Sequence, residues 1–147
     1  MQWKPHATVA AIVEQQGQFL LVEETTDRGN RFNQPAGHLE DNETLFNAVI
    51  RETLEETAYT FAPQSLLGIY HWKHVHNDTT YLRFAFIGSV TSHQPELALD
   101  VGIIRAVWMT IDEIRSKAAL MRSPQVITCI EDYLSGKQFP LDVIKHL

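Results

Sequence analysis

The stretch that decides the fold reads GHLEDNE at residues 37–43 and, after seven further residues, RETLEETAY at residues 51–59. Over residues 43–57 the apolar side chains recur at helical spacing, so we expect a helix there. Asp41 or Asn42 can cap its first turn. The glycine and polar residues before the helix predict a loop.

Three glutamates share one side of the expected helix. Glu52, Glu55 and Glu56 are related by three and four residues, and Glu52 and Glu56 continue the apolar face of Leu45, Ala48 and Val49. A carboxylate that points at the protein body needs a cation or hydrogen bonds to offset its burial. Hard divalent cations such as Mg²⁺ prefer oxygen ligands of this kind. The alternative is a solvated acidic patch, because a second apolar face also runs along this helix.

Composition limits the classes of partner. The chain has 147 residues, with 18 acidic and 12 basic side chains and a formal net charge of -6. This balance argues against a nucleic-acid polymer or an anionic membrane surface as the main partner. No signal peptide or membrane span is visible near the N-terminus, which predicts a cytoplasmic protein. The lone cysteine, Cys129, is expected to be a half-buried helix residue in a reducing compartment.

The rest of the chain predicts one α/β domain over residues 1–147. We expect a hairpin of Thr8–Val13 and Phe19–Val22 around Gly17, and a loop over Glu24–Asn33. Strands follow at Leu66–Val75, Tyr81–Val90 and Ile103–Trp108, with a hairpin turn at 76–79, helix starts at Thr110 and Ser123–Pro124, and a helix end at Gly136.

The glutamate-rich stretch resembles the Nudix box over residues 37–59. In that box a glycine, a glutamate, an arginine-glutamate pair and a final glutamate pair stand at fixed spacing. Two positions depart from the pattern: Thr53 stands where an aliphatic residue is usual, and Ala58 where glycine is usual. The resemblance implies the Nudix fold, a mixed β-sheet sandwiched between helices. The matching residues are Gly37, Glu43, Arg51, Glu52, Glu55 and Glu56.

The resemblance also implies roles for these residues. Glu52, Glu55 and Glu56 would bind Mg²⁺, or Mn²⁺ in its place, with the Gly37 carbonyl as a further ligand. Arg51 would organise the glutamates, supported by Glu43. Glu52 or Glu55 could act as the catalytic base, and the sequence leaves that choice open. Glu40 is a nearby acid, and Asp100 lies in a loop where some family members place another acid.

A closer resemblance is to the NudJ-type phosphatases. It rests on residues 32–40, on Val22-Glu23-Glu24 and Leu82-Arg83-Phe84, and on the closing segment from Arg122. That group implies hydrolysis of nucleoside tri- and diphosphates, and of hydroxymethylpyrimidine diphosphate, with release of phosphate. The predicted partner is therefore a small phosphorylated, nucleotide-like substrate of a monomer or small homo-oligomer.

Five residues are candidates for substrate contact. Trp72 could stack on a pyrimidine and Arg83 could bind phosphate, although both could equally have only a structural role in the sheet. Asn33, Gln34 and His38 flank the box and either meet the substrate or shape its turns. Two rival functions remain: a Nudix hydrolase for another nucleotide derivative, such as ADP-ribose, a dinucleoside polyphosphate or an oxidised nucleotide, and a Nudix-fold binding module without turnover.

Overall fold

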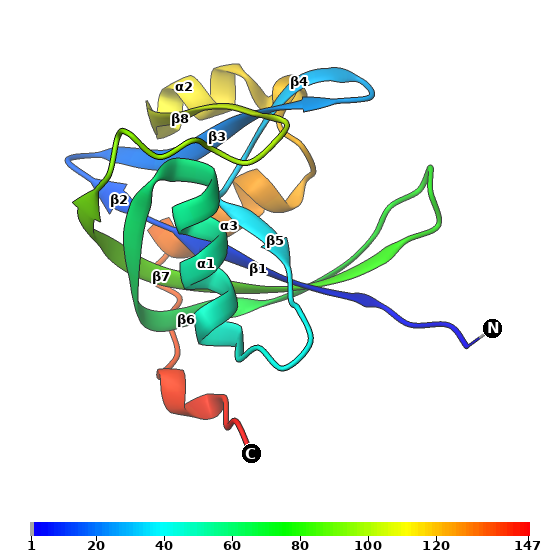
Figure 1. Ribbon diagram of the computed structural model, residues 1–147. Coiled ribbons are helices and arrows are strands. Elements are labelled where there is room, and N and C mark those ends of the chain that lie inside the picture. Colours follow the sequence, from blue (N-terminus) through cyan, green and yellow to red (C-terminus); the bar gives the residue numbers. More distant parts are fainter. Residues whose placement is uncertain (1) are drawn as a thin grey trace.

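The computed structural model describes residues 2–147 as two sheets with helices around them (Figure 1). The helices are α1 (Leu45–Thr57), α2 (Ile111–Ser116) and α3 (Gln125–Leu134), with 3-10 turns η1 (Ala118–Leu120) and η2 (Leu141–Val143). The strands are β1 (His6–Ile12), β2 (Glu14–Gln15), β3 (Gln18–Thr26), β4 (Gly29–Asn33), β5 (Ala36–His38), β6 (Tyr59–Lys73), β7 (Thr80–His93) and β8 (Ile103–Thr110). Within residues 2–147, no helix is both long and apolar enough to span a membrane.

The first sheet is mixed, and its strand order is β5-β1-β7-β6. β1 runs parallel to β7 and antiparallel to β5, and β7 is antiparallel to β6. In the second sheet β3 pairs antiparallel with β2, β4 and β8. The expected mixed sheet is therefore present, and a second, antiparallel sheet accompanies it.

Helices cover both faces of the mixed sheet. On β1, Val9 and Ala11 belong to one buried cluster with Ala48 and Val49 of α1. Ile12 belongs to the other cluster, with Val126 and Ile130 of α3. Alternate residues of a strand point to opposite faces, so one strand contributes to two cores. This arrangement confirms the predicted α/β fold with helices on both sides of a sheet.

The predicted hairpin of Thr8–Val13 with Phe19–Val22 is correct only at its end, where the Leu20 N–H donates to the Val13 carbonyl at 3.0 Å. The turn at Gly17 does form, with a positive φ of 77°, but it joins β2 to β3. β1 instead lies between β5 and β7. Both apolar runs are buried on both faces, so their pattern carries no information about which strand lies beside them.

The predicted loop at Glu24–Asn33 is also wrong. β3 continues to Thr26, and β4 pairs with it across a turn at Gly29, whose φ is 94°. The side chains at the tip of this hairpin are exposed. An antiparallel hairpin that faces water can be as polar as a loop, so composition alone misassigned it.

Helix α1 begins later than predicted. Thr44 is its N-cap, with the Thr44 hydroxyl accepting from the Asn47 N–H at 3.1 Å, so neither Asp41 nor Asn42 caps it. The predicted burial phase is correct, because Ala48, Val49, Glu52 and Glu56 are all buried.

The two departures from the box are accommodated locally. Ala58 adopts the left-handed conformation at the end of α1, with φ 62°. Thr53 is fully buried, and its hydroxyl donates to the Val49 carbonyl at 2.8 Å. The backbone at Ala58 thus has the shape that glycine would adopt more readily.

Later elements agree with the sequence. β6 and β7 form the expected long hairpin, with β6 starting earlier than predicted. Thr110 caps α2 in a capping box with Glu113. Gly136 has a φ of 89° just after α3, and Cys129 lies on α3 as expected but is fully buried rather than half-buried.

Candidate functional site

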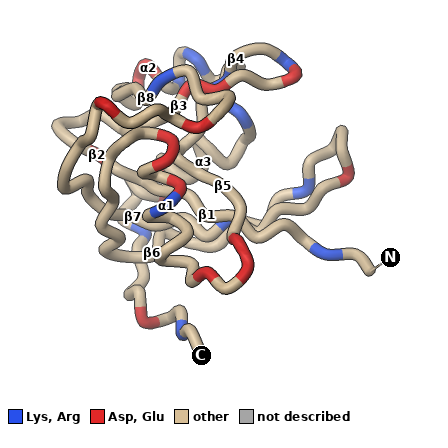
Figure 2. Tube along the Cα trace, viewed as in Figure 1, with Lys and Arg blue, Asp and Glu red and all other residues tan. Residues whose placement is uncertain are grey.

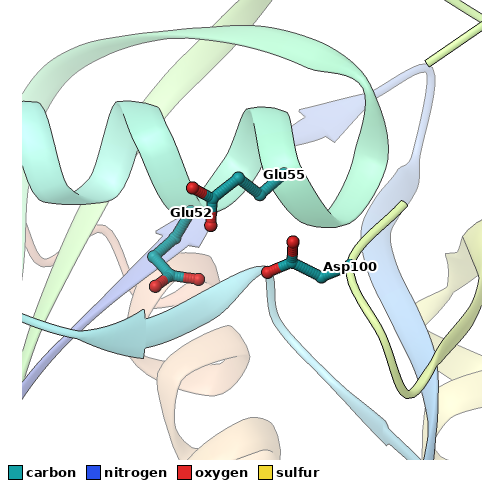
Figure 3. Close-up of side chains that lie close together, drawn as sticks. All are labelled: Glu52, Glu55 and Asp100. Atoms are coloured by element: carbon teal, nitrogen blue, oxygen red, sulfur yellow. The ribbon is translucent and has the colours of Figure 1, made fainter. Parts of the chain in front are cut away.

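Three carboxyl groups meet beside α1. Glu52 and Glu55 point from one side of the helix, and Asp100 approaches from the segment between β7 and β8 (Figure 3). One oxygen from each lies within 4.8 Å of the others. The Asp100 N–H donates to the Glu55 carbonyl at 3.0 Å, which fixes the two segments to each other. Such an oxygen-rich cluster, the acidic triad, could hold a divalent cation.

The three carboxyl groups of the acidic triad raise one another's cost of ionisation, and Arg51 offsets only part of it. Burial raises the pKa of Glu52, although Arg51 opposes the shift. Burial, followed by the nearby charge of Asp100, raises the pKa of Glu55. Acidic side chains also occupy the loop that precedes α1 (Figure 2). A bound cation would favour the charged form of these groups.

Glu56 lies apart from the triad. Its Oε1 accepts from the Ala36 N–H at 2.9 Å, and the side chain lines the same cavity as Glu52. Burial raises the pKa of Glu56 to about 9. The structure thus brings two of the three predicted glutamates together with Asp100, and it leaves Glu56 on the adjoining wall.

Gly37 lies in β5, directly against Glu52. A side chain at Gly37 would overlap the Glu52 carboxyl group, so the carboxyl group can keep its present position only beside a glycine. This contact explains physically why the stretch begins with a glycine. The role of the Gly37 carbonyl as a metal ligand stays a prediction.

Arg51 links the acidic groups. Its guanidinium donates to both Glu43 oxygens at 2.6 and 3.0 Å, to Glu52 at 2.8 Å and to Glu55 at 3.2 Å. It also donates to the His38 carbonyl at 3.1 Å. The hydrogen bond from Arg51 is the main cause of the lowered pKa of Glu43. These contacts give Arg51 the geometry of an organiser rather than of a substrate clamp.

A cavity of about 800 Å³ opens beside the triad. Its volume lies in the range of sites for drug-sized and nucleotide-sized ligands. Four of the five predicted substrate-contact residues line it: Asn33, His38, Trp72 and Arg83. Gln34 does not, because it is buried behind Arg83 and supports it. Burial, followed by the charge of His6, lowers the pKa of His38.

Arg83 is the least expected feature of the cavity wall. Its side chain is only 4% exposed, and among residues 2–147 no carboxylate forms an ion pair with it. Neutral oxygens hold it: Gln34 Oε1 at 2.8 Å and Asn33 Oδ1 at 3.0 Å. A buried cation without an anion is costly, so it favours an electron-rich ligand nearby.

Sequence reasoning missed some of the lining. Gln125 lies at the first turn of α3, and Glu24 pairs with Arg122 at 2.7 Å on the same cavity. Nothing local marks Gln125, which follows Ser123-Pro124 as an ordinary first-turn residue. Asp100 drew attention only through the family resemblance.

Comparisons with known proteins fit this arrangement. A family model described as the NUDIX domain matches residues 4–128, a range that includes the triad and Gln125. Phosphatase NudJ of Shigella boydii is 41% identical over 142 residues, covering 97% of this chain and 92% of that protein. The protein of the same name from Escherichia coli strain K12 is 40% identical over the same shares. A solved structure described as a NUDIX hydrolase from Nitrosomonas europaea is 52% identical, covers 98% of each chain and has a TM-score of 0.96.

Proposed function

Because the chain belongs to the Nudix hydrolase family, we propose that it uses Mg²⁺, or Mn²⁺ in its place, to cleave diphosphate linkages of nucleoside tri- and diphosphates with release of phosphate. The observation that carries this proposal is the acidic triad at the edge of the large cavity. The name of the NudJ relatives, phosphatase, supports phosphate as a product. The hydroxymethylpyrimidine diphosphate that this group hydrolyses is a further candidate substrate.

The position of each residue indicates its role in the proposed reaction. Glu52, Glu55 and Asp100 would hold the cation, and Glu56 and the Gly37 carbonyl would be additional ligands. When bound, a divalent cation neutralises phosphate charge and lowers the pKa of a bound water.

Arg51 keeps the carboxylates aligned through its bonds to Glu43, Glu52 and Glu55. Glu52 or Glu55 then accepts the proton of the attacking water. Asn33, His38, Trp72 and Arg83 face the substrate, and Gln34 positions Arg83.

The decisive assay measures phosphate release from a panel of diphosphate compounds, with and without Mg²⁺. The panel contains nucleoside di- and triphosphates, hydroxymethylpyrimidine diphosphate, ADP-ribose and a dinucleoside polyphosphate, and the products are identified after each reaction. We expect Mg²⁺-dependent release from the first two groups. Turnover of only the last two would assign a different substrate class. Binding without any turnover would favour the rival binding module.

Replacement of one triad residue tests the metal site directly. Glu55→Gln keeps the size of the side chain and removes its charge, so we expect turnover to fall by roughly 100-fold or more while folding is retained. Glu131→Gln, an exposed position on α3, is the matched control and should leave turnover unchanged. Normal activity in the Glu55 variant would mean that the metal site has been misplaced.

A further inference from the structure

Two buried side-chain atoms lack a hydrogen-bond partner among residues 2–147, and both belong to one cavity. They are Arg83 Nε, a donor, and Gln125 Oε1, an acceptor. Arg83 is 4% exposed and Gln125 is 9% exposed, and both side chains line the cavity beside the acidic triad. Folded proteins leave few buried polar atoms unpaired, so two on one cavity indicate a missing partner.

Gln34 fixes the two residues in one region. Its Oε1 accepts from Arg83 Nη1 at 2.8 Å, and its Nε2 donates to the carbonyl of Val126, the residue after Gln125, at 2.9 Å. Each of the other polar atoms of both side chains has at least one hydrogen-bond partner. Arg83 Nη2 donates to Asn33, and Gln125 Nε2 donates to Ser123 Oγ at 3.4 Å. The two atoms without any partner are thus one donor, Arg83 Nε, and one acceptor, Gln125 Oε1.

Because one of these atoms is a donor and the other an acceptor, the ligand must offer one acceptor and one donor. A phosphate group offers acceptors only, so it would pair with Arg83 and leave the Gln125 oxygen unsatisfied. A heterocycle with a ring nitrogen beside an amino group offers an acceptor and a donor on the same edge. Aromatic side chains that could stack on such a ring also line the cavity: Trp72 and Tyr81, whose rings lie against each other with their centroids 5.7 Å apart.

We propose that Arg83 and Gln125 recognise the edge of the substrate's base, with Arg83 donating to a ring nitrogen and Gln125 accepting from an adjacent amino group, as a 4-aminopyrimidine presents them. The inference rests on the proposed function for the position of the diphosphate, which lies at the acidic triad. Tyr81 and Arg83 are two residues apart on β7, so their side chains point to the same side of the strand. The base subsite is thus built from β7, β6 and the start of α3.

The test compares two ligands that differ by one amino group. Cytidine diphosphate carries the ring nitrogen and the amino group, whereas the diphosphate of the pyrimidin-2-one ribonucleoside lacks the amino group. Dissociation constants are measured by calorimetry without metal, and phosphate release is measured with Mg²⁺. We expect the wild-type protein to bind cytidine diphosphate roughly 5- to 150-fold more tightly, since the analogue leaves the Gln125 oxygen unpaired.

Variants of Gln125 and Arg83 show which residue causes the preference for cytidine diphosphate over the analogue. Gln125→Met keeps the length of the side chain without the acceptor, so the two dissociation constants should become equal. Gln138→Met, an exposed glutamine outside the cavity, should retain the wild-type ratio. Arg83→Lys should weaken both ligands to a similar extent, because both carry the ring nitrogen. Thermal unfolding verifies that each variant is folded.

Equal binding of the two ligands by the wild-type protein would overturn the proposal, and so would a ratio that persists in Gln125→Met. Either result would mean that a buried water, and not the base, is the hydrogen-bond partner of the two atoms. A preserved ratio without phosphate release in Mg²⁺ would instead contradict the proposed hydrolysis and leave the base subsite standing.

Discussion

Gly37 has no side chain, and this leaves the space that the Glu52 carboxyl group occupies. Gly37→Ala would place a methyl group where the Glu52 carboxyl group lies, so the Glu52 side chain would have to move. We expect the displaced carboxylate to lower Mg²⁺-dependent turnover by roughly 100-fold, the scale seen when a reacting geometry shifts by about 1 Å. Phosphate release and the melting temperature should be measured together.

A second glycine provides the control for that change. Gly68 lies in β6, and a methyl group there would meet only the Tyr70 ring at 3.4 Å, an ordinary contact. Gly68→Ala should therefore keep full activity. If Gly37→Ala were equally active, the Glu52 carboxylate would have to act from a different position than the one described.

At the scale of elements, the start of α1 depends on the far end of the chain. Thr44 caps the Asn47 N–H, and His146 Nε2 accepts from the Leu45 N–H at 3.2 Å, while its ring lies against Phe46. We expect His146→Ala to lower the free energy of unfolding by about 0.5–2 kcal/mol, as the loss of a helix cap does. Urea unfolding measures the difference.

The neighbouring residue separates the cap from a general effect of the tail. Lys145 is exposed, and Lys145→Ala should leave the free energy of unfolding within about 0.5 kcal/mol of wild type. Equal stability of the two variants would show that the His146 contact does not stabilise α1.

The elements also show which parts of this fold the sequence could predict. Spacing within α1 predicted the burial of Glu52 and Glu56, because helical geometry is local. It could not reveal Asp100, which reaches the triad only through the path of the β7–β8 segment. The pairing of β1 with β7 was likewise beyond reach, since parallel strands meet through long connections.

The residues of the cavity wall also divide into those that the sequence could predict and those that it could not. Trp72 and Arg83 could be nominated from residue type and strand position, and both line the cavity. Whether Gln34 touches substrate or supports Arg83 depends on which way a buried amide points, and the sequence does not encode that directly. Gln125 has no local signature, because its importance arises from an unpaired oxygen.

For the whole molecule, the buried Glu56 links folding to pH. Its pKa is about 9 in the folded protein, against 4.5 for an ordinary glutamate, so the folded state keeps a proton that the unfolded chain releases. Below pH 4.5 both states are protonated and the contribution to stability is fully present. As the pH rises from 4.5 toward 9, the unfolded state binds fewer protons, and the free energy of unfolding falls. Without metal, the protein should therefore lose stability toward alkaline pH.

Glu56→Gln removes this proton while its amide oxygen can still accept from the Ala36 N–H. In chelator, we expect the variant to match wild type near pH 5 and to exceed it by roughly 1–3 kcal/mol near pH 8. Glu52 and Glu55 titrate in both proteins, so their shared contribution cancels in the difference. Added Mg²⁺ should reverse the order, because a cation stabilises the ionised carboxylate and only wild type carries it. A stability difference that stays constant from pH 5 to 9 would mean that Glu56 is ionised in the folded protein, and that its burial costs less than its surroundings indicate.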